Sequence, residues 1–149
     1  MSLDLAPALR DALIDATDIS SQLSEWRGEP AVFTRRPVPA DAVFPFCIVN
    51  PDSFITDQDG LTSPRPVVGR DIAFYGRKGP PGDASDQTRI VEAMAYLARD
   101  LFHREKFSVQ PTGFSVIDVV ATGPVPAPVD DEATIGRLVS LTIRLRRNS

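Results

Sequence analysis

The stretch that decides the fold covers residues 67–103 and reads VVGRDIAFYGRKGPPGDASDQTRIVEAMAYLARDLFH. Residues 67–75 are rich in β-branched and aromatic side chains, which predicts a strand. Residues 76–82 hold three glycines and two prolines, and such a corner continues neither a strand nor a helix. Residues 83–103 then predict one long helix. The sequence therefore places a strand, a corner and a helix at the centre of the domain.

The long helix is predicted from apolar residues with a helical spacing, which is typical of an amphipathic helix lying on a sheet. The expected inner face consists of Ile90, Ala93, Met94, Leu97 and Leu101. The expected hydrated face consists of Gln87, Arg89, Glu92, Arg99 and Asp100. The polar residues just before the helix offer acceptors to its first N–H groups. They are Asp83, Ser85 and Asp86.

The other periodic segments predict shorter elements on both sides of this unit. A first helix is expected over residues 3–16, with a further turn over 19–26. Strands are expected over residues 31–34, 44–49, 54–56 and 114–121, and the closing strand alternates from Val139 to Leu145. Two long loops are expected over residues 57–66 and 123–136. Loops of that length in a compact domain are usually functional.

This order of elements favours an α+β fold. The economical arrangement is a mainly antiparallel sheet of four to five strands with two helices packed on one face. The 149 residues fit a single domain, residues 1–149, with a core of its own. Trp26 is expected to anchor that core, because no second aromatic residue stands close to it in the sequence. Cys47 is expected to be a small buried apolar residue.

Composition excludes several classes of function. The net charge of −4 counts against broad nucleic-acid binding. No apolar run approaches the ~18 residues that a membrane span needs, and the first residues lack the features of a signal peptide. One cysteine excludes an internal disulfide framework. The single histidine, His103, is expected to face the negative end of the long helix.

No catalytic or cofactor motif is complete. A phosphate-binding loop ends in Lys-Ser or Lys-Thr, whereas Lys78 comes too early, and Pro80 and Pro81 remove two N–H donors. Ser115 lacks the Gly-x-Ser-x-Gly setting of a hydrolase, and His103 is the sole candidate base. The sequence therefore contains no catalytic constellation, no cofactor motif and no metal site, and this counts only weakly against an enzyme, because active sites often lack local motifs.

The predicted loops carry the candidate partner-binding residues. Asp57 and Asp59 resemble a calcium loop, but Ile55 and Pro66 occupy its first and last ligand positions, so solvated turn residues explain them better. The candidates in and beside the loops are Asp57, Asp59, Arg65, Pro124, Asp130, Asp131 and Glu132. Arg144 and Arg146 share one face of the closing strand, and either face acids of a neighbouring subunit or face water.

The layout resembles that of the tail-terminator (tail-completion) proteins of long-tailed bacteriophages and gene transfer agents, the lambda gpU-like group. The resemblance rests on organisation over most of the chain. Its segments, in order, are LAPALRDALIDA, FPFCIVNPD, GRDIAFYGRKGPPGDASDQTRIVEAMAYLARDLF, FSVIDVV and GRLVSLTIRLRR.

The resemblance implies a structural virion protein that is not an enzyme. Members form a hexameric ring at the head-proximal end of the tail tube, where the ring stops tube growth and docks the head. The implied partners are other copies of the chain, the major tail tube protein and the head-completion or stopper protein of the connector. DNA passes through the lumen without specific binding. The protein is assembled in the host cytoplasm and resides in the virion.

Three alternatives remain open on the sequence. The first is another head–tail neck protein, of the stopper or head-completion class. The second is a small ligand-binding domain or enzyme with a pocket between the long helix and the sheet. The third is a regulatory adaptor that binds a protein through residues 130–132.

Overall fold

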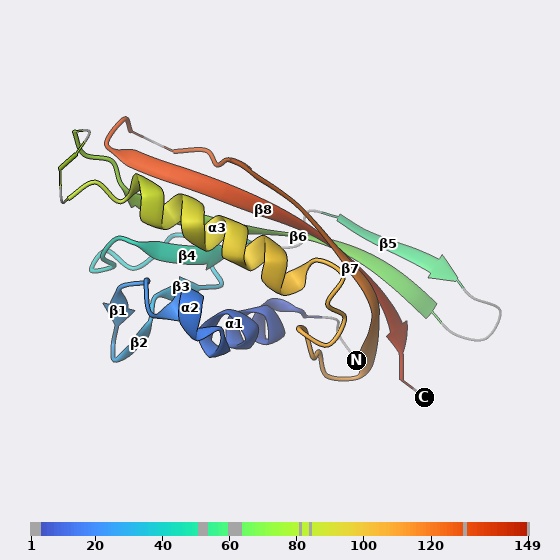
Figure 1. Cartoon of the computed structure of the whole chain (residues 1–149). Coiled ribbons are helices and arrows are strands. Elements are labelled where there is room, and N and C mark those ends of the chain that lie inside the picture. The colour runs from blue at the N-terminus through green and yellow to red at the C-terminus, as the bar shows by residue number, and fades with distance from the viewer. Residues whose placement is uncertain are drawn as a thin grey trace.

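The computed structural model describes residues 4–50, 54–59, 64–80, 82–83, 85–129 and 131–148. In these residues, two helices come first in the chain, followed by six strands, a third helix and two long final strands (Figure 1). The helices are α1 (Ala6–Asp15), α2 (Thr17–Ser20) and α3 (Thr88–Phe102). The strands are β1 (Glu25–Trp26), β2 (Glu29–Pro30), β3 (Val32–Phe33), β4 (Phe46–Val49), β5 (Phe54–Asp59), β6 (Pro64–Arg77), β7 (Phe114–Pro126) and β8 (Thr134–Arg147).

One twisted sheet organises the fold. Its strand order is β3-β4-β6-β8-β7, and β5 pairs with the same edge of β6 as β4 does, nearer the start of β6. All pairs are antiparallel except β3 with β4. β6 and β8 form the longest ladder, from Val67 opposite Arg144 to Arg77 opposite Thr134. The predicted α+β class is confirmed, with one more strand in the sheet than expected.

The main core lies between the helices and one face of the sheet. α1 contributes Leu9 and Leu13, and α3 contributes Met94 and Phe102, all fully buried. β8 alternates as expected, because its odd-numbered apolar residues 139–145 are buried, whereas Arg144 and Arg146 are exposed. Burial of this apolar surface is the main force that holds the two layers together.

The predicted inner face of the long helix is wrong by about one position. The buried residues of α3 are Val91, Met94, Ala95, Ala98 and Phe102. Ile90 is 38% exposed and Ala93 is exposed, while Leu97 and Leu101 lie at the margins of the interface. The small side chains of Ala95 and Ala98 let the helix approach the sheet closely. The sequence pattern depends mainly on large apolar residues, so it does not identify these alanines as part of the inner face.

A second apolar cluster covers part of the opposite face of the sheet. Its buried members are Ala31, Phe33, Phe46, Ile48, Ala73, Tyr75 and Ala127. They alternate along β4 and β6 with residues of the main core, so both faces of the sheet are covered at this end. This explains why residues 44–49 read as a continuous apolar run.

The two predicted loops are wrong over most of their length. Residues 54–59 and 64–66 form an antiparallel hairpin, in which Asp57 pairs with Pro66 and Gln58 with Arg65. Residues 123–126 and 134–136 extend β7 and β8, with Val125 opposite Leu138. Proline is compatible with edge strands such as β7, because an outward-facing position needs no N–H donor. A register shift between Thr122 and Val125 accommodates Gly123 and Pro124.

The expected helical turn over residues 19–26 is also partly wrong. α2 ends at Ser20, and Trp26 lies in the small β1–β2 hairpin. Arg27 and Gly28 connect the two strands with φ angles of 52° and 82°. Two successive positive φ values are the signature of a tight two-residue hairpin turn.

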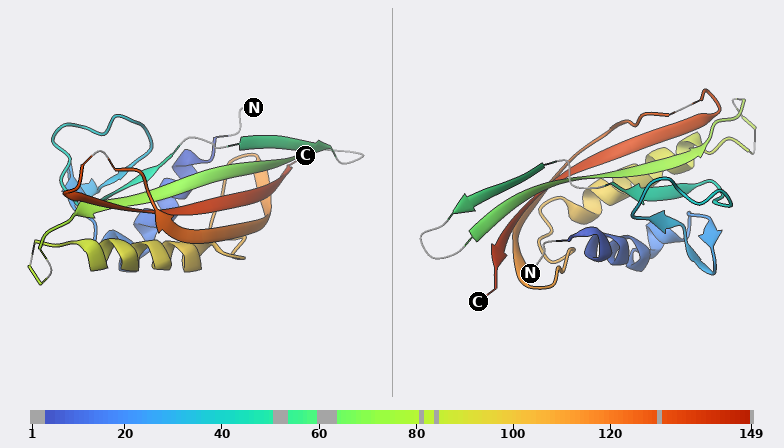
Figure 2. Two further views of the ribbon diagram at one scale, coloured as in Figure 1. Left: turned by 90° about the horizontal axis from the view of Figure 1, so that it is seen from above. Right: turned by 180° about the vertical axis from the view of Figure 1, so that it is seen from behind.

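The sheet is longer than the layer of helices. Figures 1 and 2 show β5 and the first half of β6 projecting past the ends of α1 and α3. We call β5 together with residues 64–69 of β6 the arm. Within the described residues β6 is the one strand that pairs with β5, so the outer edge of the arm carries no ladder.

Candidate functional site

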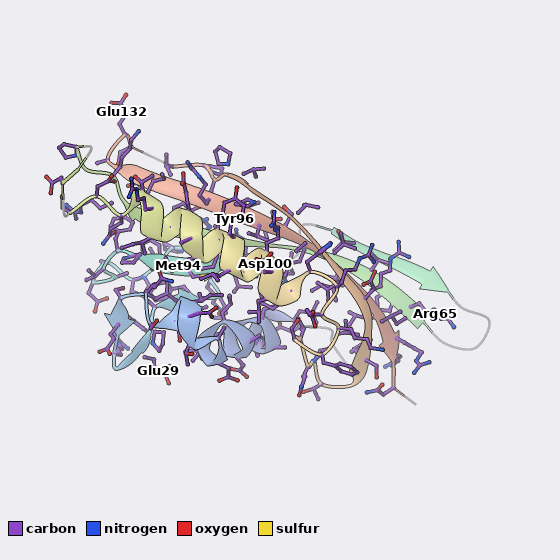
Figure 3. All side chains as sticks on the ribbon, viewed as in Figure 1. Glu29, Arg65, Met94, Tyr96, Asp100 and Glu132 are labelled. Carbon is purple, nitrogen blue, oxygen red and sulfur yellow. The ribbon has the colours of Figure 1, made fainter. Side chains whose placement is uncertain are left out.

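The predicted partner-binding residues fall at opposite ends of the sheet. Asp57 and Asp59 occupy positions on β5, and Arg65 lies on β6 at the far end of the arm. Glu132 lies at the other end, as the labels of Figure 3 show. Asp131 stands beside it, and Asp130 lies outside the described residues. Pro124 lies within β7, between the two ends. The partner-binding role of these residues stays a prediction.

The arm end is basic on the face turned away from the helices. Arg144 pairs in register with Val67, so Arg65 and Arg146 follow two residues on along the same face. All three arginines are exposed. Within the described part of the chain none of them has a hydrogen bond or an ion pair, which leaves three guanidinium groups available to an anionic partner.

The opposite end is built from an acidic loop, residues 127–133, that joins β7 to β8. Asp131 closes a turn, because its Oδ1 accepts hydrogen bonds from Ala133 N (2.8 Å) and Thr134 Oγ1 (3.0 Å). Lys78 N donates to Ala133 O at 2.7 Å, which fixes the corner before α3 against the loop. Glu132 is exposed and makes no hydrogen bond in the described residues. Its carboxylate therefore faces solvent.

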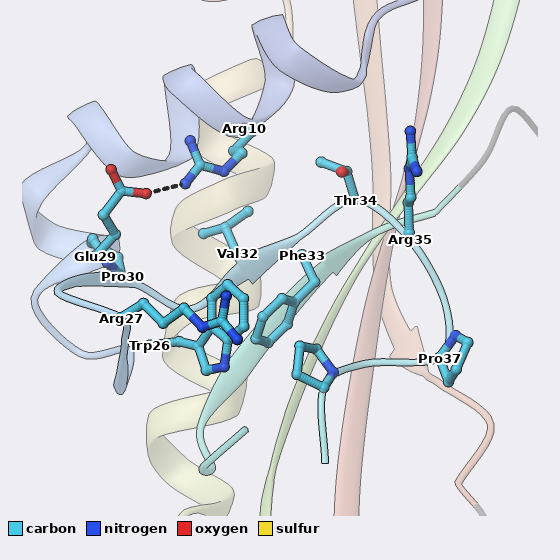
Figure 4. A pocket seen from close by; sticks show the side chains of 11 residues that line it. Arg10, Trp26, Arg27, Glu29, Pro30, Val32, Phe33, Thr34, Arg35 and Pro37 are labelled. Atoms are coloured by element: carbon cyan, nitrogen blue, oxygen red, sulfur yellow. Dashed lines mark hydrogen bonds and ion pairs between the residues drawn. The ribbon is translucent and has the colours of Figure 1, made fainter. Parts of the chain in front are cut away.

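A recessed site, which we call the Trp26 pocket, lies between the β1–β2 hairpin and residues 34–39 (Figure 4). Its volume is about 340 Å³. Its lining combines aromatic, proline and charged side chains: Arg10, Trp26, Arg27, Glu29, Pro30, Val32, Phe33, Thr34, Arg35, Pro37 and Pro39. Arg10 Nη2 donates to Glu29 Oε2 at 2.6 Å, which is the ion pair drawn in Figure 4.

Trp26 does have aromatic neighbours, contrary to the prediction. Its ring meets Phe33 edge to face, with the centroids 5.4 Å apart, and Phe33 meets Phe46 at 5.8 Å. Trp26 Nε1 donates to Asp41 Oδ1 at 3.0 Å, and this hydrogen bond lowers the pKa of Asp41. These neighbours come from β3 and β4, so sequence proximity does not reveal them. Trp26 is half-buried at the wall of a pocket.

A larger groove of about 730 Å³ lies next to this pocket, over the second apolar cluster. Phe44 and Phe46 stack in it at 5.0 Å, and Tyr75 forms part of its floor. Arg36 crosses it, because its Nη2 donates to Tyr75 Oη at 3.0 Å and its Nε to Asn50 Oδ1 at 3.1 Å. Its guanidinium is therefore already engaged.

The two residues with catalytic potential, Cys47 and His103, are both engaged in the packing of the fold. Cys47 is fully buried, and burial raises the pKa of its thiol. His103 ends α3, and its Nδ1 accepts a hydrogen bond from Ala121 N at 3.1 Å. This hydrogen bond ties the C-terminal end of α3 to β7.

The described residues contain neither a cluster of metal ligands nor a helix that could span a membrane. No group of three or more potential ligands among His, Cys, Asp and Glu comes together there. None of the described helices has the length and apolarity to cross a membrane.

Comparison with known proteins gives one informative result. No family model matches the sequence, and no curated protein matches it. Among solved structures, a chain from "Virion of native gene transfer agent (GTA) particle" superposes with a TM-score of 0.67. The two chains share a fold. The similarity covers 97% of this chain and 95% of the other at 15% sequence identity.

Proposed function

We propose that this chain is a structural protein of a phage-like virion. It forms a ring on the head-proximal end of the tail tube, ends the growth of the tube and joins the tail to the head connector. The similarity to a chain of a gene transfer agent virion supports the virion assignment, because it extends over almost the whole of both chains. The order of elements that resembles the tail terminators supports the finer role.

The projection of the arm beyond the helices is the observation that best supports a role in assembly. A hairpin that projects past its own helices leaves backbone donors and acceptors along its outer edge. Monomeric proteins usually protect such edges, because they invite pairing with another chain. The arm end adds Arg65, Arg144 and Arg146 without intramolecular partners among the described residues. Contacts with neighbouring subunits would satisfy both features.

The partners follow from this placement. Neighbouring copies of the chain complete the ring. The major tail tube protein and the head-completion protein contact its two outer faces. DNA passes through the lumen without specific binding, which suits a chain with a net charge of −4.

Electron microscopy of the purified protein, alone and mixed with tail tubes, tests this function. The expected result is a ring at one end of each tube, and tubes that stop growing when the protein is added. Tubes from which the protein has been omitted are the control and should continue to grow. Binding to isolated connectors without any effect on tubes would instead identify another neck protein of the stopper or head-completion class.

A small ligand-binding domain or enzyme has less support. That alternative places its pocket between the long helix and the sheet, where side chains such as Met94, Phe102 and Val139 fill the space completely. The finding that the protein is a monomer, converts a small molecule and does not bind tube ends would overturn the proposed function.

A further inference from the structure

We propose that the Trp26 pocket of one copy receives the acidic loop of the next copy, so that head-to-tail contacts of this kind close the ring. This inference rests on the proposed function for the existence of the ring. It assigns the pocket a ligand, which is a short acidic segment of a second copy of this chain. The argument depends on charge, on shape and on where the two surfaces lie.

The pocket carries excess positive charge. Three guanidinium groups line it, from Arg10, Arg27 and Arg35, against the single carboxylate of Glu29. Glu29 already forms an ion pair with Arg10. Arg27 and Arg35 are exposed and have no carboxylate within ion-pair distance in the described residues, although Arg27 lies near enough to Asp41 to help lower the pKa of that carboxyl. The guanidinium groups of Arg27 and Arg35, at the mouth of the pocket, are therefore available to bind an anion.

Arg27 is held in place for such a contact. Its guanidinium carbon lies 4.5 Å from the centroid of the Trp26 ring, and its backbone has a φ of 52° in the hairpin turn. Stacking on an aromatic ring leaves the edge of a guanidinium free to donate two parallel hydrogen bonds to a carboxylate. The rings of Trp26 and Phe33 below offer an apolar surface.

The acidic loop presents the complementary groups. Val129 exposes 43% of its surface, although it is apolar, and Glu132 follows three residues later. Asp131 already accepts two hydrogen bonds within its turn, so Glu132 is the described carboxylate of the loop that is free to bind. We expect Val129 to contact the aromatic wall and Glu132 to meet Arg27 and Arg35.

The positions of the two surfaces favour a contact between copies. In Figure 3, Glu132 of the loop lies at the upper edge and Glu29 of the pocket at the lower edge of the same end of the molecule. Within one chain the loop lines the larger groove next to the pocket, through Pro128, Val129 and Asp131, and none of these residues lines the pocket itself. Two different surfaces make a head-to-tail interface, and such interfaces generate closed rings when the rotation between subunits allows it.

A protein carboxylate fits the pocket better than a DNA phosphate does. Glu29 stands in the wall and repels anions of higher charge, and the whole chain has a net charge of −4. A recessed volume of about 340 Å³ also suits a side chain rather than the backbone of a duplex. Binding of DNA at this pocket is therefore an outcome that would overturn the proposal.

Charge reversal on tube-bound rings is the main test. Glu132→Arg should abolish rings, and so should Arg27→Glu combined with Arg35→Glu. The chain that carries all three substitutions should form rings again, because the ion pairs are restored with opposite sign. Arg89→Glu, on the exposed side of α3, is the matched control and should leave rings intact. Normal rings from Glu132→Arg alone, or no recovery in the triple variant, would overturn the inference while leaving the proposed function in place.

A peptide titration tests the contact without any ring. Trp26 is the single tryptophan of the chain, so its fluorescence reports directly on the pocket. A capped peptide with the sequence of residues 127–134 (APVDDEAT) should change this fluorescence, and the same peptide with Glu132→Lys should bind about tenfold more weakly. No change up to about 1 mM peptide, or a response to duplex DNA instead, would contradict the assignment. Peptide binding without rings at tube ends would contradict the proposed function alone.

Discussion

The body of the molecule and the arm use the same strand in different ways. In the body, Ile72 and Phe74 of β6 are fully buried beneath the helices. In the arm, Arg65 of the same strand is exposed and no helix lies over the sheet. The body therefore contains most of the core, whereas the arm contributes Val68 to it at its inner end and is otherwise held by the ladders of its strands.

Arg70 marks the boundary between the two regions. It is the one buried charged residue among those described, and it lies on the helix side of β6. Its Nη1 donates to Asn50 O at 2.7 Å, and its Nη2 lies 3.4 Å from Asp4 Oδ1. A polar network thus interrupts the apolar core between Val68 and Ile72, which lie on the same face of β6 as Arg70. The body therefore contains most of the buried apolar surface, and the arm is the region to which the proposed function assigns contacts with other subunits.

The largest predicted effect lies in the body. Phe102→Ala removes a fully buried ring between α3 and the sheet and leaves a cavity. Such substitutions cost about 3–5 kcal/mol, which approaches the whole stability of a small domain. Urea unfolding followed by circular dichroism should show a much lower midpoint. Phe107→Ala is the control, because Phe107 is 78% exposed, and it should change the unfolding free energy by less than about 0.5 kcal/mol.

Shortening the arm should separate stability from assembly. Replacing residues 57–66 by Asn-Gly joins Thr56 to Val67 through a two-residue turn. Thr56 and Val67 face each other in the ladder, so their strands can be connected in this way. Asn-Gly forms the preferred two-residue hairpin turn, so the remaining strands keep their register. We expect the free energy of unfolding to change by less than about 1 kcal/mol, while rings on tube ends disappear.

The same variant tests whether the arm is independent of the body in stability and whether it is needed for assembly. A loss of several kcal/mol would mean that the arm is part of the body's cooperative unit. Normal rings from the shortened chain would mean that assembly uses other surfaces. Either result would be visible by combining urea unfolding with electron microscopy of tube ends.

The sequence predicted the body well, because burial imposes a period on it. The alternation of residues 139–145 reports directly which side of β8 is covered. The long helix was also found, although its inner face is displaced, because Ala95 and Ala98 carry the closest packing and look neutral in a sequence.

The arm and the Trp26 pocket escaped prediction for physical reasons. A strand covered by neither layer needs no apolar alternation, so the polar residues 57–59 read as a loop. The pocket unites residues of α1, two hairpin strands and β3, which only tertiary packing brings together. One local signal did exist for it. Arg27-Gly28 between short strand-like pairs is compatible with a tight hairpin turn, and it places Arg27 over Trp26.

The smallest predicted effect concerns the corner that starts α3. Asp86 Oδ1 accepts hydrogen bonds from Thr88 Oγ1 (2.6 Å), Thr88 N (3.2 Å) and Gly79 N (3.3 Å). The hydrogen bond from the Thr88 hydroxyl, helped by the backbone donors and the charge of Lys78, lowers the pKa of Asp86. Because the folded pKa is below the unfolded value, this stabilisation is present above about pH 4 and is lost as pH falls through the folded pKa.

The protection factors of the Thr88 and Arg89 amides, which compare their hydrogen-exchange rates with those of unstructured amides at the same pH, should therefore fall in acid in the native protein. Asp86→Asn keeps an acceptor at this position but removes the ionisable group, so protection of these amides should stop depending on pH in this range. Asp100→Asn, on the exposed side of the same helix, is the control and should leave the acid dependence unchanged. If Asp86→Asn retains it, Asp83 is the next candidate, because Ser85 hydrogen bonds lower its pKa in the same corner. In either case the change stays local, because the corner lies outside both apolar clusters.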